Sequence, residues 1–325
     1  MKKPLVILTG PTAVGKTELS IALAKAINGE IISADSMQVY KQMDIGSAKI
    51  KKEEMGGVKH YLIDEFEPDE EFNVVKFQEY AKRYINEIYE KGKIPILVGG
   101  TGFYIQAVLY DIDFTENKED SSYRRELEEM AKTKGAKYLH DELAKVDLEA
   151  SKQIHSNNVK RVIRALEFFE QTGQKISEHN EEQKQKKSPY EFVYFVLNDD
   201  RDVLYERINL RIDRMLEDGL LKEVSELKKK GFTKDMVSMQ GLGYKEILSF
   251  LDQEITLEEA IYILKRDTRH FAKRQITWFK RESDVTWLHL PNYEHDRQKV
   301  LEEMIKKVGT IYEFGNGLYV QGIRN

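Results

Sequence analysis

The sequence contains no cysteine among its 325 residues. This absence excludes disulfide bonds, thiolate metal sites and cysteine nucleophiles, so any metal must be bound by oxygen or histidine ligands. Long apolar runs are also absent, because no stretch approaches the ~18 consecutive apolar residues of a membrane-spanning helix. The start of the chain, MKKPLVILTGPT, has no signal-peptide cleavage pattern. We therefore expect a cytoplasmic protein with no membrane partner.

An overall excess of basic charge is missing as well. The formal net charge is −5, which does not favour nucleic-acid binding, although such a sum says little about a local field. Hydrophobic residues make up 41% of the chain and charged residues 33%, which is typical of a globular protein. At this length we expect one main core and a smaller lobe.

Apolar runs alternate with amphipathic stretches near both ends of the chain. Strands are expected at Leu5–Thr9, Glu30–Ala34, Ile94–Val98, Glu191–Leu197 and Val285–Leu290. Helices are expected at Glu18–Ile27, where Asn28 and Gly29 close the helix, at Val74–Lys91, and from Arg201 to about Glu282. This alternation predicts an α/β fold with a parallel sheet covered by helices.

The strand pattern disappears between about Asp111 and Ser188, where helical stretches such as Tyr123–Lys132 and Asn158–Gln171 are joined by polar segments. We expect an inserted all-helical domain at residues 113–189, and a discontinuous core domain made of residues 1–112 and 190–325. The polar stretch Ser177–Ser188 fits either a mobile connection or a solvated helix end.

Residues 10–17, with the sequence GPTAVGKT, form a P-loop pattern between an expected strand and an expected helix. Such a loop needs glycines so that backbone N–H groups can converge on phosphate oxygens, a lysine to offset charge, and a hydroxyl for Mg²⁺. Gly10, Gly15, Lys16 and Thr17 supply these groups. The motif predicts phosphate binding, but kinases, ATPases, GTPases and transferases with a diphosphate leaving group all use it.

Asp35 follows the second expected strand, so it should emerge beside the P-loop at the edge of the sheet where α/β proteins bind ligands. Its carboxylate could hold Mg²⁺ through water or take a proton from a nucleophile. The alternative is a turn or helix-cap acid.

A second glycine cluster, Gly99-Gly100-Thr101-Gly102, follows another expected strand. Alone, this sequence more often forms a structural turn. Beside a P-loop, however, Thr101 could present its hydroxyl near the phosphates or the breaking bond.

Two groups of basic residues stand out near the C-terminal end. Arg207, Arg211 and Arg214 share one helical face, which is either solvated surface or a site for diphosphate oxygens. Residues 260–281 carry seven lysines and arginines against one aspartate. There Lys273 lies on two basic stripes, and this face is either solvated or suited to a phosphate backbone.

Together, GPTAVGKT, DSMQVY, GGTGFY, RINLRIDRML, QGLGYKE and DTRHFAKRQITWF resemble, in order and spacing, the bacterial tRNA dimethylallyltransferases. The resemblance covers roughly residues 4–290. It implies transfer of a dimethylallyl group from dimethylallyl diphosphate to the N6 amine of the adenosine immediately 3′ of the anticodon, with release of pyrophosphate. It also implies Mg²⁺ as cofactor and the anticodon stem-loop of tRNA as partner. We expect a monomer.

The resemblance also implies roles for individual residues. Asp35 would be the base, while Thr101 and Arg211 would steady the bridging oxygen and the departing pyrophosphate. Thr17 would bind Mg²⁺. The diphosphate would be held by the P-loop residues Gly10, Thr12, Ala13, Val14, Gly15, Lys16 and Thr17. The tRNA would be contacted by Asp35, Ser36, Met37, Gln38, Thr101, Arg124, Lys160, Arg161, Arg164, Gln240, Lys273 and Arg274.

The sequence departs from the family pattern at Val159-Lys160, where many relatives have Pro-Gln, and at Gln240-Gly241, where others have an arginine and a small residue. The tail from Gly309 to Asn325, with a hairpin signal at residues 314–318, lies beyond the pattern and receives no role. Two rival functions use the same motifs: a small-molecule P-loop kinase, and an ATP-driven RNA-binding switch. The kinase leaves the basic 260–281 stretch unexplained.

Overall fold

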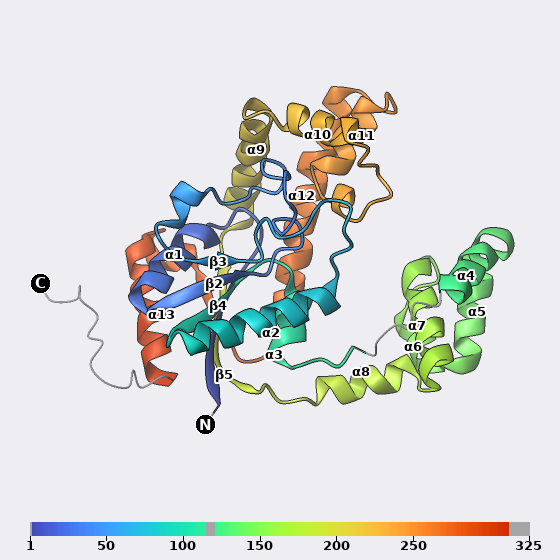
Figure 1. Cartoon of the computed structure of the whole chain (residues 1–325), viewed down its shortest axis with the longest axis horizontal. Coiled ribbons are helices and arrows are strands. Elements are labelled where there is room, and N and C mark those ends of the chain that lie inside the picture. The colour runs from blue at the N-terminus through green and yellow to red at the C-terminus, as the bar shows by residue number, and fades with distance from the viewer. Residues whose placement is uncertain (1, 115–120, 312–325) are drawn as a thin grey trace, which may run out of the picture. The chain divides into compact units, whose positions relative to one another are not determined.

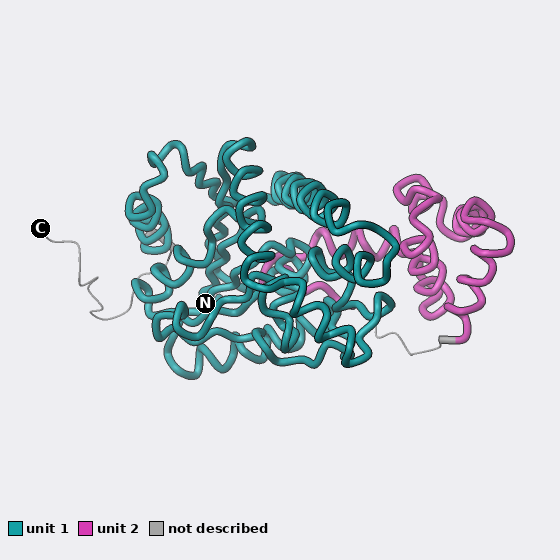
Figure 2. The backbone as a smooth tube through the Cα atoms, turned by 90° about the horizontal axis from the view of Figure 1, so that it is seen from above, with its two compact units in different colours: residues 1–109, 189–325 teal, residues 110–188 magenta. Residues whose placement is uncertain are grey.

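The computed structural model of the chain describes residues 2–114 and 121–311, so the hairpin signal at residues 314–318 lies outside the described residues. The chain divides into two compact units, residues 1–109 with 189–325 (unit 1) and residues 110–188 (unit 2), coloured separately in Figure 2. Each unit is described by itself.

Unit 1 is built on a six-stranded sheet with the order β3-β2-β4-β1-β5-β6, in which every pairing is parallel. The strands are β1 (Lys3–Thr9), β2 (Gly29–Ser33), β3 (His60–Tyr61), β4 (Ile94–Gly99), β5 (Tyr190–Asn198) and β6 (Val285–His289). The central strand β1 places Leu5, Val6, Ile7 and Leu8 in the core with no exposed surface. Continuous apolar runs of this kind are typical of strands covered on both faces.

Helices connect and cover the strands (Figure 1). The helices between or after the first strands are α1 (Lys16–Ala26), the 3₁₀-helix η1 (Lys52–Met55), α2 (Val74–Glu90) and α3 (Gly102–Leu109). After β5 come α9 (Arg201–Glu217), α10 (Leu220–Lys229), η2 (Ser238–Gln240), α11 (Tyr244–Leu251), α12 (Leu257–Phe279), η3 (Leu290–Tyr293) and α13 (Arg297–Ile311). The crossover through α1 runs from β1 toward β2, and the crossover through α2 runs back to β4. Because such crossovers are right-handed, α1 and α2 cover opposite faces of the sheet.

Unit 2 is entirely helical over its described residues. Its helices are α4 (Ser121–Lys134), α5 (Ala136–Val146), α6 (Leu148–Gln153), α7 (Val159–Thr172) and α8 (Ile176–Lys184). They enclose their own apolar core, which includes Leu139, Leu143, Val162 and Ile163. Of the two readings of the polar stretch 177–188, the solvated helix end is confirmed, because α8 runs through most of it without a buried residue.

The expected α/β class with a parallel sheet is confirmed, with small differences in detail. The two-residue strand β3 was not predicted. Gly29 does not close the first helix but begins β2, and Asn28 instead takes the left-handed backbone conformation, with φ of 54°. No helix in the described part of the chain is both long and apolar enough to cross a membrane.

Candidate active site

The P-loop connects β1 to the first turn of α1. Gly10 has φ of 145°, and a Cβ placed on it would lie 2.5 Å from the carbonyl oxygen of Leu197 in β5. Only glycine therefore allows the loop to pass so close to the neighbouring strand. Gly15 caps α1 without a side chain, which leaves the first N–H groups of the helix directed toward the loop. This arrangement is suited to binding an anion.

The side chain of Lys16 folds back over the same loop. Its Nζ donates hydrogen bonds to the carbonyl oxygens of Gly10 (2.9 Å) and Pro11 (2.8 Å). Burial lowers the pKa of Lys16 to about 7; the charge of Asp35 opposes this shift and that of Arg211 adds to it. An anion entering the pocket would stabilise the charged form of Lys16.

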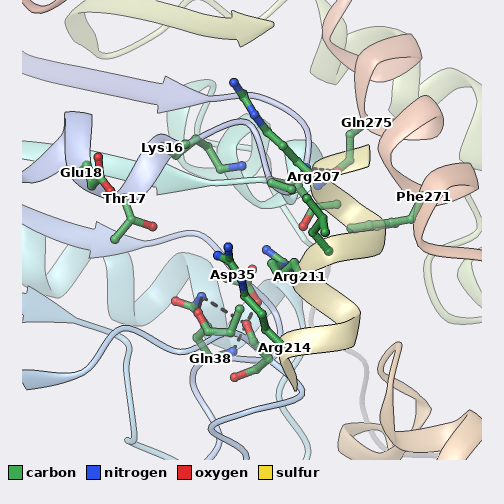
Figure 3. A pocket seen from close by; sticks show the side chains of 17 residues that line it. Lys16, Thr17, Glu18, Asp35, Gln38, Arg207, Arg211, Arg214, Phe271 and Gln275 are labelled. Carbon is green, nitrogen blue, oxygen red and sulfur yellow. Dashed lines mark hydrogen bonds between the residues drawn. The ribbon is translucent and has the colours of Figure 1, made fainter. Parts of the chain in front are cut away.

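Asp35 lies just beyond the carboxyl end of β2. Its Oδ1 accepts hydrogen bonds from the backbone N–H groups of Met37 (2.8 Å) and Gln38 (3.3 Å). Asp35 also lines a pocket together with Lys16 and Thr17 (Figure 3). The carboxylate is therefore a turn acid and a pocket group at once, and the two readings of the sequence are not exclusive.

The arginines of α9 face this pocket. Arg207, Arg211 and Arg214 all line it, so their shared helical face is not simply solvated surface. Arg207 donates to the buried carboxylate of Asp199 (Nη1 to Oδ2, 2.7 Å) at the end of β5. Burial lowers the pKa of Arg211, and the charge of Asp35 partly offsets this effect.

The pocket as a whole is cationic, and two large apolar side chains also line it. It encloses about 500 Å³ and is lined by the cations of Lys16, Arg207, Arg211 and Arg214, but by only two carboxylates, those of Glu18 and Asp35. Leu210 and Phe271 are its two large apolar lining residues. Among the described residues no cluster of three or more histidine, aspartate or glutamate side chains could hold a metal ion. A metal here would depend on the Thr17 hydroxyl and on phosphate oxygens of a ligand, which is the usual mode for Mg²⁺.

The segment after Asp35 forms a second wall of the pocket. Gln38 lines it, and its Nε2 donates to the carbonyl oxygens of Ser47 (3.4 Å) and Ala48 (3.2 Å). Met37 packs against Gly241, where a Cβ would lie 2.5 Å from the Met37 methyl group. The DSMQ and QGLG motifs are therefore in contact. Ser36 is half-buried, and the exposed Gln240 donates to the carbonyl oxygen of Lys234.

Glu223 of α10 holds this wall in place, although no role was predicted for it. Its carboxylate accepts hydrogen bonds from the backbone N–H groups of Asp44 (2.9 Å), Ile45 (2.7 Å) and Gly46 (3.1 Å). It also accepts a hydrogen bond from the Tyr244 hydroxyl (2.8 Å). The loop that receives the amide of Gln38 is thus held from outside the pocket.

Thr101 lies at the start of α3, one residue beyond the pocket-lining Gly100. Its N–H donates to the carbonyl oxygen of Ala34 (3.3 Å), and its carbonyl accepts from the N–H of Tyr104 (3.0 Å). Thr101 itself is not among the lining residues. The predicted role of its hydroxyl therefore stays a prediction.

Four of the five lysines and arginines of α12 divide into two groups, and the fifth, Arg266, pairs with the adjacent Asp267. Arg269 donates to Asn209 Oδ1 (2.7 Å), and Lys265 pairs with Asp213 (2.5 Å), so both tie α12 to α9. Lys273 and Arg274 are instead exposed to solvent. Only the second group offers the open cationic surface that RNA binding requires.

The predicted RNA contacts of the helical insertion all lie in unit 2. Lys160 and Arg161 are exposed in the first turn of α7, and Arg164 is half-buried. Arg124 forms a two-pronged ion pair with the buried Glu167, through Nε to Oε1 (2.9 Å) and Nη2 to Oε2 (2.7 Å). Arg124 therefore also links α4 to α7.

Gln275 and Phe271 of α12 line the pocket but received no role from the sequence. Gln275 bridges two loops: Thr12 N–H donates to its Oε1 (2.9 Å), and its Nε2 donates to the Gly100 carbonyl oxygen (2.9 Å). The backbone N–H of Thr12, a residue predicted to hold the diphosphate, is therefore occupied by the Gln275 side chain. A polar residue on the buried face of a basic helix was the one signal that could have identified Gln275.

Comparison with known proteins gives a consistent result. The family model described as IPP transferase matches residues 38–282. The chain is 66% identical over 304 residues to the tRNA dimethylallyltransferase of Lachnoclostridium phytofermentans, covering 94% of this chain and 97% of that protein. It is 54% identical to the enzyme of the same name from Clostridioides difficile, covering 91% and 94% respectively.

Solved structures are similar as well. The full-length tRNA isopentenylpyrophosphate transferase of Bacillus halodurans has a TM-score of 0.71 and 46% identity, covering 95% of this chain and 98% of that one. A eukaryotic dimethylallyltransferase acting on tRNA has a TM-score of 0.80 at 31% identity, covering 94% and 80%. The similarity extends over both units.

Proposed function

The chain belongs to the IPP transferase family, and we propose that its pocket carries out dimethylallyl transfer to tRNA, with dimethylallyl diphosphate as donor and the adenosine N6 amine as acceptor. One observation carries this proposal: the P-loop, Asp35 and the α9 arginines all open onto the same pocket. A cationic site in which the charge of Asp35 acts on Lys16 suits a leaving diphosphate and a nucleophile that must lose a proton.

The nucleophile sets the first requirement. The lone pair of an adenine amine is delocalised into the ring, so the amine attacks weakly unless its proton is taken as the new bond forms. The N6 nitrogen bonds to the allylic carbon while the bond from that carbon to the diphosphate oxygen breaks, and the N6 proton passes to the Asp35 carboxylate. Because the Met37 and Gln38 N–H groups orient this carboxylate, it is held in place before the substrate arrives.

The leaving group sets the second requirement. Negative charge grows on the diphosphate as the carbon–oxygen bond breaks, so donors fixed around it lower the barrier. Lys16, Arg211 and Arg214 are available for this role, together with the amino-terminal N–H groups of α1. Mg²⁺, when bound, neutralises part of the diphosphate charge; Thr17 is the residue that would hold it. The P-loop thus holds the group that leaves.

The donor also has an apolar part, which suits Leu210 and Phe271. Both line the pocket, and Leu210 keeps half of its surface exposed (50%) on the arginine-bearing face of α9. We assign these two side chains to the dimethylallyl group, which they would shield from water.

The acceptor base must leave the anticodon stack to reach Asp35, because a stacked base cannot enter a pocket at a sheet edge. Asp35, Ser36, Met37 and Gln38 would contact it. The exposed Lys273 and Arg274, and Lys160 and Arg161 of unit 2, would contact the RNA backbone. The cytoplasmic location and the monomeric state stay predictions.

The test is a reaction of the purified chain with unmodified tRNA, dimethylallyl diphosphate and Mg²⁺ in the absence of ATP. We expect a prenylated adenosine in the mass spectrum of the digested tRNA, and one pyrophosphate per modified nucleoside. A tRNA with a different base 3′ of the anticodon is the control. Failure with the correct tRNA, together with ATP-dependent phosphorylation of a metabolite or RNA-stimulated ATP hydrolysis, would favour one of the rival functions.

A further inference from the structure

One side chain, that of Gln275, joins the two loops that face each other at the pocket. Its amide accepts from the Thr12 N–H and donates to the Gly100 carbonyl, both at 2.9 Å. Only 6% of its surface is exposed, so water competes poorly for either hydrogen bond. Both partners are backbone groups, and the amide therefore fixes the path of the chain on both sides.

The two loops begin at the same level of the sheet. Thr9 and Gly99 are paired at the ends of β1 and β4, and the Thr9 hydroxyl donates to the Gly99 carbonyl (2.6 Å). Beyond this point the backbones leave the sheet, and Gln275 bridges them. Gly100 makes the bridge possible, because a Cβ at this position would lie 2.2 Å from Nε2 of Gln275.

The bridge also leads to the proposed base. The N–H of Thr101, next to Gly100, donates to the carbonyl oxygen of Ala34, and Ala34 immediately precedes Asp35. A continuous set of contacts therefore runs from the P-loop through Gln275 and the Gly100–Thr101 loop to the end of β2. The P-loop, which would hold the diphosphate, lies at one end of this set of contacts, and Asp35, the proposed base, lies at the other.

From this arrangement we propose that Gln275 is a positioning residue of the transfer reaction, which sets the spacing between the P-loop and the Gly100–Thr101 loop. This inference rests on the proposed function. In a displacement reaction the attacking nitrogen, the carbon and the leaving oxygen must be aligned, and a misplacement of about 1 Å can cost about a hundredfold in rate. Gln275 acts on this alignment through the backbone, without touching the reacting atoms.

The competing explanation is that Gln275 only helps α12 to pack. The chain offers a matched control in Gln106 of α3, whose Nε2 donates to Oε1 of Glu282 just beyond the end of α12 (2.7 Å). Gln106 thus links α3 to the C-terminal end of α12, but it does not line the pocket and is not part of the bridge between the two loops. Loss of either amide weakens packing, whereas only loss of Gln275 would change the spacing of the loops.

The kinetic test compares Gln275→Met with Gln106→Met, because methionine keeps the size of glutamine but forms neither hydrogen bond. At saturating tRNA and donor we expect the single-turnover rate of Gln275→Met to fall by about tenfold or more, with tRNA affinity changed less than about twofold. Gln106→Met should keep its rate, even if its Tm falls as far. A wild-type rate in Gln275→Met, or an equal loss in Gln106→Met, would overturn the proposal.

A second measurement does not depend on activity. Amide hydrogen exchange of Thr12 in the substrate-free chain should be about tenfold faster in Gln275→Met than in the wild type, and unchanged in Gln106→Met. Gln275→Glu, which keeps an acceptor for Thr12 N–H but loses the donor to Gly100, should retain the slow exchange. If the wild-type chain fails to prenylate tRNA, the exchange result still decides whether Gln275 orders the P-loop. Unchanged Thr12 exchange in Gln275→Met would refute the positioning role.

Discussion

The Oδ1 of Asp35 accepts a hydrogen bond from the N–H of Met37 at 2.8 Å, so one carboxylate both faces the pocket and holds the turn after β2. An alanine at this position would remove the turn and the base together. Asparagine separates the two roles, since its side-chain oxygen can accept the same N–H bonds but cannot take a proton at neutral pH.

We predict that Asp35→Asn lowers the single-turnover transfer rate by about a hundredfold or more, the usual contribution of a general base. Its Tm and its affinity for tRNA should stay close to those of the wild type, whereas Asp35→Ala should also lose stability. Quenched-flow measurement of prenylated nucleoside checks the rate. A nearly normal rate in Asp35→Asn would show that Asp35 is not the general base and only stabilises the turn after β2.

The affinity for pyrophosphate should depend on pH through Lys16. Because the pKa of Lys16 is about 7 in the free chain, its ammonium is charged below this pH and increasingly neutral above it. A bound diphosphate raises that pKa, so binding takes up a proton above pH 7 and weakens as the pH rises. Calorimetry at about pH 8.5 in buffers of different ionisation enthalpy measures the uptake. The wild type should take up more protons than Lys16→Met. This variant corrects for titration of pyrophosphate itself. Equal proton uptake by the two proteins would contradict the prediction.

Phe271→Ala should weaken binding of the allylic part of the donor only. Loss of one buried aromatic contact of about 2 kcal/mol would raise the KM for dimethylallyl diphosphate by about ten- to thirtyfold. The inhibition constant of pyrophosphate, measured in the same assay, should hardly change. Phe103→Ala, at an exposed phenylalanine outside the pocket, is the control. If KM and inhibition constant rise together, Phe271 does not contact the allyl group.

Replacement of Lys273 and Arg274 by glutamine should weaken tRNA binding and flatten its salt dependence. Each lost phosphate contact lowers the slope of log K against log salt by about 0.7 to 0.9, so the double variant should lose between one and two units. Lys229→Gln with Lys230→Gln, a second exposed basic pair, should leave the slope unchanged. Filter binding across a salt series makes the comparison, and equal slopes in wild type and the α12 double variant would make this face ordinary surface.

Glu223→Gln should loosen the wall that receives the Gln38 amide. An amide in place of the carboxylate weakens three backbone hydrogen bonds, so we expect a loss of about 2 kcal/mol in the free energy of unfolding. Tyr244→Phe removes one bond to the same carboxylate and should cost about 1 kcal/mol. Urea unfolding measures both. Equal or negligible losses would show that the loop from Asp44 to Gly46 is held by other contacts.

Most of the sheet could be predicted from the sequence, because its strands are nearly continuous apolar runs such as Leu5–Thr9. The order of the strands could not be predicted, since parallel pairing joins segments far apart, as with Val6 and Val193. The two-residue β3 gave no periodic signal. The length and composition of an apolar run are local properties of the sequence, whereas the strand with which it pairs is not.

The same distinction between local and non-local features applies to the candidate site. The P-loop, Asp35 and the arginine face are local motifs, so the sequence located them without the fold. Gln275 could not be assigned, because its partners Thr12 and Gly100 are 263 and 175 residues away. Lys273 and Arg274, which precede it in the sequence, indicated RNA binding instead. Thr101 is the opposite case. Its motif predicted a role near the phosphates, but Thr101 does not line the pocket, so the role stays a prediction.

The position of unit 2 between β4 and β5 has a consequence for biosynthesis. Central strand β1 pairs with β5, so this half of the sheet cannot form until residues 110–188 have left the ribosome. Unit 2, whose contacts are local and whose core is its own, can fold first. Until β5 arrives, β1 has an open edge, and the nascent core is then most exposed to aggregation.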